Sequence, residues 1–330
     1  MFVKEGMNMK LNDFLRNLSM QMRQFFKGCY KLFYMKPVIF YKTYGCPAIN
    51  EFEIHLDFKY SPDSFYPAIL MSDEKKAKKI YSRMVDFDDK GIPMYRGFEQ
   101  RYWPVTITQC ALLNYNFYLS HSNKEKYKKR LIAICDWLLE NIDAETGSWL
   151  CNIHYHCTVA DEDMKPPFCS AMVQGQAISA LVRCFKLTND EKYLDCAGKA
   201  LKPLMTPVCE GGAYREFAGL PFYEEYPTKK ASMVLNGFMF TLFGLYDLST
   251  CQCKYSTKAL ELFEAGYNTL VKLLPLYDGG FCSRYSLSHI TVRPNYNSNP
   301  LYHPIHVNQL IAINSIKSSY VFEYYINDWK

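Results

Sequence analysis

The chain lacks several patterns that define large classes of proteins. Its 13 cysteines include no CxxC pair and follow no regular spacing, so we expect no disulfide framework. No run of about 18 apolar residues occurs, so we expect no membrane span. The N-terminal stretch has charges every few residues and no long apolar block, so we expect no cleaved signal sequence. These absences favour a reducing cytoplasm.

Cofactor and metal patterns are also scarce. No nucleotide-binding glycine pattern appears, and the chemistry inferred below needs no redox cofactor, so we expect no cofactor. Two histidine arrangements offer a few metal ligands, the segment HYHC at 154–157 and the pair His303 and His306. Neither has further ligands at a recognisable spacing, so we expect no bound metal. The acidic run at 161–163 is interpreted as a solvated loop.

Aromatic residues, in contrast, are abundant. They make up 16% of the 330 residues, and 27 of them are tyrosines. Tyrosine rings stack on sugar faces and their hydroxyls bond to sugar hydroxyls, although most single rings are simply part of the core. With 49% hydrophobic and 22% charged residues, the composition is otherwise that of a globular protein.

Positive charge is concentrated in residues 1–44. This segment holds eight lysines and arginines against Glu5 and Asp13, whereas the whole chain has a net charge of only +5. Its apolar residues recur at helical spacing: Leu11, Phe14, Leu15, Leu18, Met22, Phe25, Phe26 and Tyr30. Such a basic amphipathic arm either lies on an anionic membrane surface or packs on the body with its lysines in solvent. No recognised nucleic-acid-binding motif accompanies the charge, so we expect no nucleic acid partner.

The rest of the chain predicts helical hairpins. Four apolar helices each follow an aromatic or proline-bearing loop and carry Gln or Asn in their first turns. Each is followed by a more amphipathic helix, at 124–142, 190–206, 255–274 and 316–329. Recurrence at roughly 60–70 residues predicts a mainly α fold, an incomplete α/α toroid whose inner helices present their polar first turns to a cleft. The last helix either completes the body or forms a homodimer contact.

Short β segments are expected beside these hairpins. Residues 211–217 and 221–225 flank a turn and predict a β-hairpin over the cleft, and a Gly-rich turn at 277–280 leads into Tyr285. The segment FEIHLDFKYSP also alternates, which predicts a small β element before the first helix. We therefore expect three regions: the basic arm at 1–44, a small β-containing region at 45–100 and the toroid at 101–330.

One segment, YEEYPT at 223–228, is the most informative for chemistry. It puts a tyrosine beside a carboxylate, on a turn ahead of a helix that carries the polar Asn236 in an apolar run. A glutamate next to a tyrosine suits proton transfer at carbon, because one group removes a proton while the other delivers or relays one. The segments around Tyr285 and Tyr302 have the same character. Together they indicate an enzyme that acts on an acidic sugar.

Several stretches resemble the C-terminal domain of D-glucuronyl C5-epimerases, the enzymes of heparin and heparan sulfate synthesis. They match in order and at similar spacing: SAMVQGQAISALVR (170–183), EEYPTKKASMVLNGFMFTLFGLYDL (224–248), LLPLYDGG (273–280) and HPIHVNQL (303–310). The resemblance covers roughly residues 130–325. The stretch YWPVTITQCALLNY (102–115) is similar to the segment ahead of the family's β domain. The helical part follows it without a long insert, so the chain resembles a compact version without the β-sandwich.

The resemblance implies roles for individual residues. The glutamate and tyrosine of the family's EEYPT motif correspond to Glu225 and Tyr226, and two further tyrosines correspond to Tyr285 and Tyr302. We expect Glu225 and Tyr302 to be the two acid/base groups, with the other two tyrosines orienting the carboxylate and relaying protons. Substrate-binding residues are expected among the aromatics, amides and histidines at the loop ends of the inner helices: Tyr102, Gln176, Asn236, His303, His306 and Asn308.

One departure from the family concerns the substrate carboxylate. The family's tyrosine after the turn is followed by Asp, Leu, Arg and His, whereas here Tyr285 is followed by the sequence SLSH. The arginine that would pair with the carboxylate is therefore replaced by Ser288, and Arg293, Arg101 or Lys229 can take its role. This leaves open whether the glycan is N-sulfated, N-acetylated or different from heparosan.

These patterns predict a cytoplasmic uronic acid C5-epimerase, an isomerase that acts on a glucuronate-containing polysaccharide or lipid-linked glycan near the inner membrane face. A polysaccharide lyase is the nearest alternative, because it begins with the same proton removal and then eliminates the 4-substituent. A glycoside hydrolase would need a suitably spaced carboxylate pair, and the adjacent Glu224 and Glu225 face opposite ways on a strand. A non-catalytic glycan-binding protein is the alternative from a different class.

Overall fold

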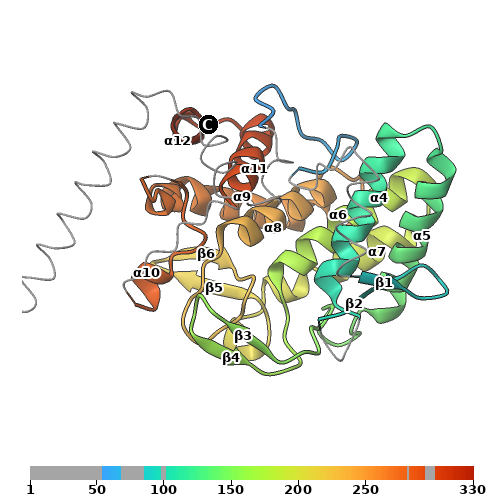
Figure 1. Ribbon diagram of the computed structural model, residues 1–330, viewed down its shortest axis with the longest axis horizontal. Coiled ribbons are helices and arrows are strands. Elements are labelled where there is room, and N and C mark those ends of the chain that lie inside the picture. The colour runs from blue at the N-terminus through green and yellow to red at the C-terminus, as the bar shows by residue number, and fades with distance from the viewer. Residues whose placement is uncertain (1–53, 68–84, 98–101, 281, 294–301) are drawn as a thin grey trace, which may run out of the picture.

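The computed structural model describes residues 54–67, 85–97, 102–280, 282–293 and 302–330. The predicted basic arm at 1–44 lies outside these residues. Helices dominate the described part and form consecutive hairpins around a common core (Figure 1). The mainly α fold and the incomplete α/α toroid predicted from the sequence are confirmed. Within the described residues, no helix has both the length and the apolar character that crossing a bilayer requires.

Each hairpin pairs an inner helix with an outer one. The inner helices are α4 (Pro104–Ser120), α6 (Ala171–Thr188), α8 (Leu235–Ser249) and α11 (His303–Ile316). The outer helices are α5 (Lys124–Asn141), α7 (Lys192–Lys199), α9 (Ser256–Leu273) and α12 (Tyr320–Trp329). The inner helices are buried on nearly all sides, whereas α5 buries one stripe at helical spacing: Tyr127, Leu131, Ile134, Cys135 and Leu138. This difference explains why the inner helices carry long apolar runs, whereas α5 has an extensive polar face.

Short elements complete the path of the chain. The predicted helix at 190–206 is interrupted: α7 ends at Lys199, and a 3-10 turn, η2 (Lys202–Leu204), follows around Pro203, which has no N–H to donate. Two more 3-10 turns, η3 (Val208–Glu210) and η4 (Leu274–Tyr277), and the single-turn helix α10 (Ser288–Thr291) lie in the connections.

In neighbouring inner helices, early residues of one helix contact early residues of the next, and later residues contact later residues. Near the start of α4, the Thr108 hydroxyl donates to Gln176 Oε1 of α6 at 3.1 Å. Further along both helices, the Arg183 guanidinium lies 5.2 Å from the Tyr115 ring centroid. Arg183 in turn pairs with Asp247, near the end of α8. The helices α4, α6 and α8 therefore run in the same direction, and their first turns meet at one end of the molecule.

Glycines permit a close crossing of α6 and α8. A Cβ atom on Gly244 would lie 2.2 Å from the carbonyl oxygen of Gly175, and a Cβ atom on Gly175 would lie 2.4 Å from the Cα of Thr241. Any larger residue at either position would push the two helices apart. On the other side of α8, Gln309 Nε2 of α11 donates to the Asn236 carbonyl at 3.1 Å.

The strands of the described part form three antiparallel pairs: β1 (Val85–Phe87) with β2 (Pro93–Tyr95), β3 (Tyr155–Cys157) with β4 (Glu162–Met164), and β5 (Tyr214–Phe217) with β6 (Leu220–Tyr223). The β5–β6 pair confirms the hairpin predicted between 211 and 225. Its turn uses Ala218 and Gly219, which both have a positive φ. In Figure 1, the β3–β4 pair lies at the bottom of the molecule and the β5–β6 pair lies above it, at the lower left.

The segment 54–67 contains no strand, so the β element predicted in FEIHLDFKYSP is wrong for the residues that the structure describes. Helix side chains satisfy its backbone instead. The Asn116 amide accepts from the Tyr66 N–H at 2.8 Å and donates to its carbonyl at 3.2 Å, and Ser315 accepts from the Tyr60 N–H at 2.9 Å. The β structure in this part of the chain is the later pair β1–β2.

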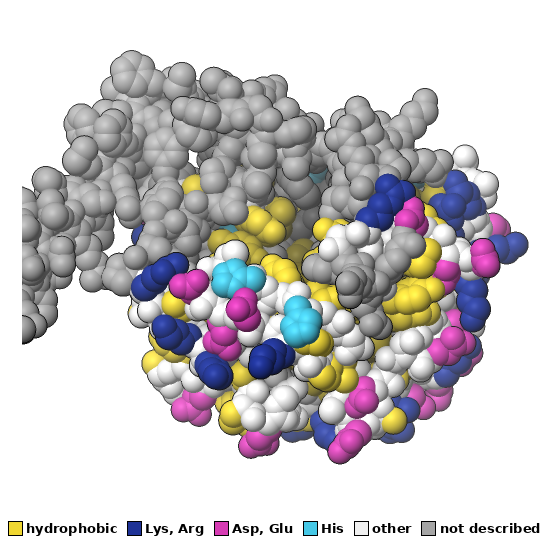
Figure 2. Space-filling view, turned by 60° about the horizontal axis from the view of Figure 1, so that its bottom comes forward, with side chains coloured by type: hydrophobic (Ala, Val, Ile, Leu, Met, Phe, Trp, Pro, Cys, Tyr) yellow, Lys and Arg dark blue, Asp and Glu magenta, His cyan; other side chains and the backbone are white. Residues whose placement is uncertain are grey.

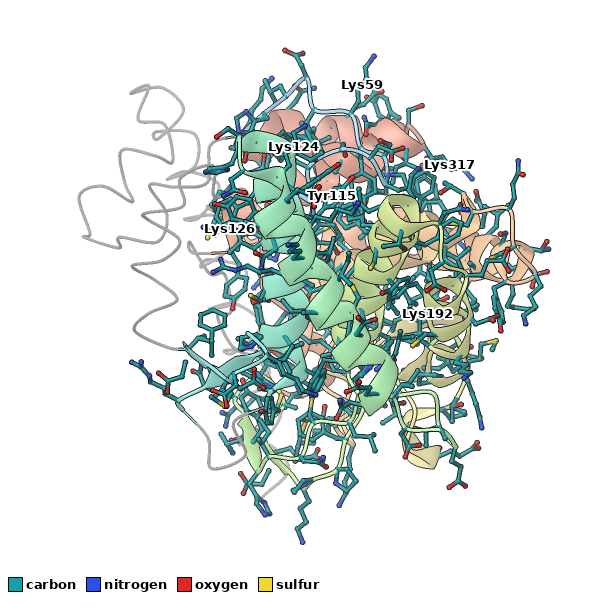
Figure 3. All side chains as sticks on the ribbon, turned by 90° about the vertical axis from the view of Figure 1, so that its right-hand side faces the viewer. Lys59, Tyr115, Lys124, Lys126, Lys192 and Lys317 are labelled. Atoms are coloured by element: carbon teal, nitrogen blue, oxygen red, sulfur yellow. The ribbon has the colours of Figure 1, made fainter. Side chains whose placement is uncertain are left out.

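A buried ion pair fixes this segment over the later turns of the inner helices. Arg183 Nη1 lies 2.5 Å from Asp247 Oδ2, and both side chains are fully buried. The Tyr60 hydroxyl lies 2.9 Å from each oxygen of Asp247, and the guanidinium lies 5.1 Å from the Tyr66 ring centroid. In Figure 3, Tyr115 lies inside the molecule near this cluster, whereas Lys59, on the same segment as Tyr60, lies at the upper edge.

The last helix completes the body. Phe322 and Trp329 of α12 are buried, and the Trp329 carbonyl lies 2.9 Å from Nε2 of His303, the first residue of α11. Tyr320 and Tyr324 on its other side are exposed.

Candidate active site

The loop after β6 carries two adjacent glutamates with opposite surroundings. Glu224 is fully buried, and its carboxylate accepts from Arg215 Nε at 2.8 Å, from the Ser232 hydroxyl at 2.7 Å and from the Met233 N–H at 3.0 Å. Its backbone carbonyl accepts from the N–H of Ala171, the first residue of α6, at 2.9 Å. Glu224 therefore anchors the loop at the first turns of α6 and α8.

Glu225 has no such partners. It is 4% exposed, and its Oε2 atom is buried without a hydrogen-bond partner among the described residues. Burial raises the pKa of this carboxyl from 4.5 to about 7; the Tyr226 hydroxyl opposes the rise and the charge on Glu224 adds to it. A carboxyl with such a pKa takes up and releases protons near neutral pH, as a general acid or base must.

A glycine in the first turn of α8 makes room for this carboxyl. A Cβ atom on Gly237 would lie 2.3 Å from Glu225 Oε2 and 2.7 Å from Glu225 Cβ. The glutamate therefore packs directly against the helix backbone, which fixes its position from one side.

Four phenols surround Glu225. The rings of Tyr285 and Tyr302 lie 4.5 Å apart between centroids, and those of Tyr155 and Tyr226 are stacked at 5.4 Å. The Glu225 charge raises the pKa of each of the four. The structure thus brings together Glu225, Tyr226, Tyr285 and Tyr302, which come from three separate segments of the sequence, and adds Tyr155.

The phenols are held in their protonated form. Burial, the largest cause, and the Glu225 charge raise the pKa of Tyr302 to about 12, although hydrogen bonding with Tyr285 opposes the rise. The same two causes raise the pKa values of Tyr226 and Tyr285 well above their ordinary range. At neutral pH these groups are proton donors, while Glu225 is the group that can accept a proton.

The backbone of Tyr285 is joined to the start of α8. Its carbonyl accepts from the N–H of Leu235 at 2.9 Å, and the Leu287 N–H donates to the Met233 carbonyl at 3.3 Å. Met233 has a φ of 49°, in the left-handed region that a methionine rarely adopts. The Tyr277 hydroxyl, which donates to its carbonyl at 2.9 Å, and the Glu224 carboxylate hold it there. A strained residue held in this way at a functional site keeps neighbouring loops in one arrangement.

The two histidines of α11 have different surroundings. His303 accepts from the Ser283 N–H at 2.9 Å through Nδ1, so its Nε2 carries the proton given to the Trp329 carbonyl. His306 Nδ1 lies 2.7 Å from the Ser283 hydroxyl, and its Nε2 is buried without a partner among the described residues. Burial and the nearby His303 lower the pKa of His306, which keeps it neutral. Its ring lies 6.2 Å from the Tyr302 ring.

The other four expected substrate-binding residues differ in how fully their polar groups are bonded within the protein. Gln176 accepts from Thr108, and its Nε2 is buried without a partner among the described residues, as is Oδ1 of Asn236. The Asn308 Oδ1 accepts from the His55 N–H at 3.3 Å. The Tyr102 ring stacks on Trp137 of α5, and its hydroxyl donates to Asp88 at 2.8 Å. Tyr102 and Asn308 thus have protein partners, whereas Gln176 and Asn236 each have one buried polar atom without a partner among the described residues.

The acidic run at 161–163 is largely solvent-exposed, as interpreted from the sequence, but Glu162 and Asp163 belong to the strand β4 and all three residues have partners. Asp163 lies 2.6 Å from His156 Nδ1, and the Glu162 carboxylate accepts from the Lys229 N–H at 2.9 Å. Asp161 pairs with Arg293 at 3.1 Å. In the part of the chain that the structure describes, no three His, Cys, Asp or Glu side chains are arranged to hold a metal ion.

The position expected for a carboxylate-binding arginine is enclosed. Ser288 is fully buried, and its hydroxyl accepts from that of Ser286 at 3.0 Å. Of the residues proposed to replace the arginine, Arg101 lies outside the described residues, and Arg293 is engaged with Asp161. Lys229 is exposed beside the loop that carries Glu225.

Figure 2 shows the face that lies at the bottom of Figure 1, on the side of the β3–β4 hairpin. Hydrophobic side chains are visible in a hollow there, and histidines, basic residues and acidic residues lie in front of it.

Tyr155 is the residue of this cluster that sequence reasoning did not select. It belongs to the HYHC segment, which was weighed only for its metal ligands. Tyr155 is two residues before Cys157, so the alternation of a strand puts both side chains on the same face. Nothing local in the sequence indicates that the Tyr155 ring contacts Tyr226, 71 positions later.

Comparison with known proteins gives two kinds of match. A family model described as the D-glucuronyl C5-epimerase C-terminus matches residues 142–330. A D-glucuronyl C5-epimerase of Caenorhabditis elegans is 38% identical over 219 residues, which are 62% of this chain and 35% of that protein. The chain therefore spans about a third of the length of this relative.

More distant similarities extend the comparison. An uncharacterised protein of Methanocaldococcus jannaschii is 24% identical over 221 residues, covering 62% of this chain and 68% of that protein. Among solved structures, a family 76 glycoside hydrolase from a bovine Bacteroides thetaiotaomicron strain matches 74% of this chain and 51% of its own, with a TM-score of 0.47 and 14% identity.

Proposed function

Because this chain belongs to the D-glucuronyl C5-epimerase family, we propose that it inverts C5 of D-glucuronate residues in a glycan to give L-iduronate. The observation that carries the proposal is Glu225: a buried carboxyl with a pKa of about 7, whose Oε2 atom has no hydrogen-bond partner among the described residues, surrounded by protonated phenols. Inversion at carbon requires one group that takes a proton and another that gives one, and this cluster offers both.

In the proposed reaction, the Glu225 carboxylate takes the C5 proton, and the electron pair of the broken C–H bond moves into the substrate carboxylate. Tyr302 then donates its hydroxyl proton to the opposite face of C5, and the electron pair returns to form the new C–H bond. The turnover ends with Glu225 protonated and Tyr302 ionised. Tyr226 and Tyr285 both interact electrostatically with Glu225, and Tyr285 also interacts with Tyr302. In the proposal, they orient the substrate carboxylate and relay the protons that restore the starting state.

The substrate class follows from the same chemistry. The partner is an acidic, glucuronate-containing polysaccharide or lipid-linked glycan, because proton removal at C5 needs the adjacent carboxylate to receive charge. We also keep, as part of the proposal, a cytoplasmic location with the basic arm at 1–44 on an anionic membrane surface.

The test is incubation of the purified protein with heparosan and with its N-sulfated form in D2O, followed by NMR. Deuterium at C5 together with iduronate signals is the expected result. An unsaturated, ultraviolet-absorbing uronate would make the protein a lyase, and deuterium without iduronate would limit it to exchange on one face. No exchange on either polymer or on other glucuronate glycans would contradict an enzymatic role.

A matched pair of variants tests the assigned base. Glu225→Gln removes the proton acceptor and is expected to lower C5 exchange by at least about a hundredfold. Glu216→Gln, which changes an exposed glutamate of β5, is expected to keep full activity. Unchanged turnover in the first variant would remove Glu225 from the mechanism.

A further inference from the structure

The β3–β4 hairpin touches the catalytic loop at two points. The Tyr155 ring lies against the Tyr226 ring with an angle of 10° between their planes, and the two hydroxyl oxygens are 3.5 Å apart. On the other strand, both Glu162 oxygens accept from the Lys229 N–H, at 3.1 and 2.9 Å. The hairpin therefore contacts the loop at both ends, at Tyr226 and at Lys229.

The hairpin is itself a firm support. Cys157, Ala160 and Met164 form a small buried cluster, against which Phe168 and the Tyr226 ring pack. In the register of the hairpin, Tyr155 is opposite Met164, so one end of the strand pair carries Tyr155 and the cluster lies beside it. Movement of the Tyr155 ring would disturb this packing, which restrains it.

Tyr226 lies on a loop without helix or strand. Its carbonyl accepts from the Thr228 N–H at 2.8 Å and from the Ser232 hydroxyl at 3.3 Å, but these bonds hold the backbone and do not fix the plane of the ring. Among the described residues, Tyr155 supplies its stacked aromatic partner. A tyrosine that stays protonated acts through the direction of its hydroxyl, so the plane of its ring decides whether that hydroxyl meets Glu225.

We propose that Tyr155 is a positioning residue for the reaction: its ring fixes the plane of Tyr226 and its hydroxyl directs the Tyr226 hydroxyl toward Glu225. The proposal rests on the epimerase function above, and nothing in the sequence comparison assigns Tyr155 a role. The stack accounts for most of the effect, because an O–O distance of 3.5 Å is longer than a strong hydrogen bond between hydroxyls.

Two substitutions separate ring from hydroxyl. Tyr155→Leu removes the stack and is expected to lower kcat by about tenfold or more with KM nearly unchanged, since small misplacements of catalytic groups are costly. Tyr155→Phe keeps the stack and is expected to lower kcat only about twofold to threefold. Tyr193→Phe is the matched control: it removes another phenol, bonded to Asp136 at 2.8 Å on the outer helix α7, and should leave kcat unchanged. A wild-type kcat for Tyr155→Leu would overturn the proposal.

A second measurement needs no activity and therefore separates failure of this inference from failure of the proposed function. With 3-fluorotyrosine incorporated at Tyr226, 19F NMR of the full chain reports the environment of that ring. The expected result is a resonance shifted by the stack, which moves to the position of a free tyrosine in Tyr155→Leu and hardly moves in Tyr155→Phe. An identical resonance in the Leu variant would show that Tyr155 does not position Tyr226.

Discussion

At the scale of single residues, Glu224 and Glu225 show how surroundings decide the use of a side chain. Glu224 receives three hydrogen bonds and anchors a loop, whereas Glu225 has a buried oxygen without a described partner. A buried carboxylate oxygen without a hydrogen-bond partner is costly, and proteins keep such groups where the ionisation itself is useful.

The pKa of Glu225 predicts the pH dependence of turnover. A base must be ionised, so kcat/KM for C5 exchange is expected to rise about tenfold per pH unit below pH about 7 and to level off above it. The Tyr302 pKa of about 12 keeps the proton donor intact well into alkaline solution. Initial rates of deuterium incorporation across this range provide the measurement, and a profile that is flat through neutral pH would contradict the assignment.

The raised pKa of Glu225 also predicts that ionisation of this carboxyl destabilises the folded protein. Because the folded-state pKa exceeds that of an exposed glutamate, the folded protein binds the extra proton and loses stability as pH rises from about 4.5 to 7. Glu225→Gln removes this penalty and is expected to stabilise the protein at pH about 8 by roughly 2–3 kcal/mol, with little gain at pH about 4.5. Urea unfolding at both pH values measures it. Glu224→Gln, which weakens three hydrogen bonds, should destabilise instead.

At the scale of elements, the first turn of α8 decides where Glu225 can lie. Gly237→Ala puts a methyl group 2.3 Å from the Oε2 atom of Glu225, so the loop that carries Glu225 must move away from the helix. We expect a loss of about 1–3 kcal/mol of stability and a larger loss of activity than the fraction of unfolded protein explains.

Gly198→Ala is the control for Gly237→Ala. It drives a methyl group into the Tyr255 ring, far from the catalytic loop in sequence and on the outer helix α7. It should lower the melting temperature comparably while the folded fraction keeps full C5 exchange. Equal activity losses in both variants would mean that Gly237 matters only for folding.

The elements also show what the sequence could predict. Apolar runs after Pro-bearing loops predict the inner helices to within a few residues. Because these helices are buried on nearly all sides, their sequences are apolar over most of their length. The segment 54–62 alternates like a strand, but its backbone partners are side chains such as Asn116 and Ser315, which no local pattern announces. Likewise the pairing of Tyr155 with Tyr226 joins the strand β3 to a loop that lies far from it in the sequence, and only the packed fold reveals it.

At the scale of the whole molecule, the two ends of the inner helices have separate tasks. Their first turns carry Gly237, Tyr302 and His306 beside the candidate site, whereas their later turns hold the segment 54–67 through Arg183 and Asp247. The core lies between these ends.

Breaking the buried ion pair is expected to reduce stability strongly. Arg183→Met leaves Asp247 buried without its cation and should cost about 3–5 kcal/mol, measured by urea unfolding. Lys186→Met, on the same helix, breaks the exposed pair with Asp63 on the same segment and should cost less than about 1 kcal/mol. Similar costs for the two variants would contradict the view that the buried pair holds the segment.

The division between the two ends has a practical consequence for protein engineering. Exposed positions at the end with the candidate site, such as Glu216 of β5, can be varied to seek new glycan substrates while Tyr155 and the hairpin core are kept. Conversely, a more heat-resistant catalyst is best sought around Tyr60 and Tyr66, where changes do not touch the reacting groups.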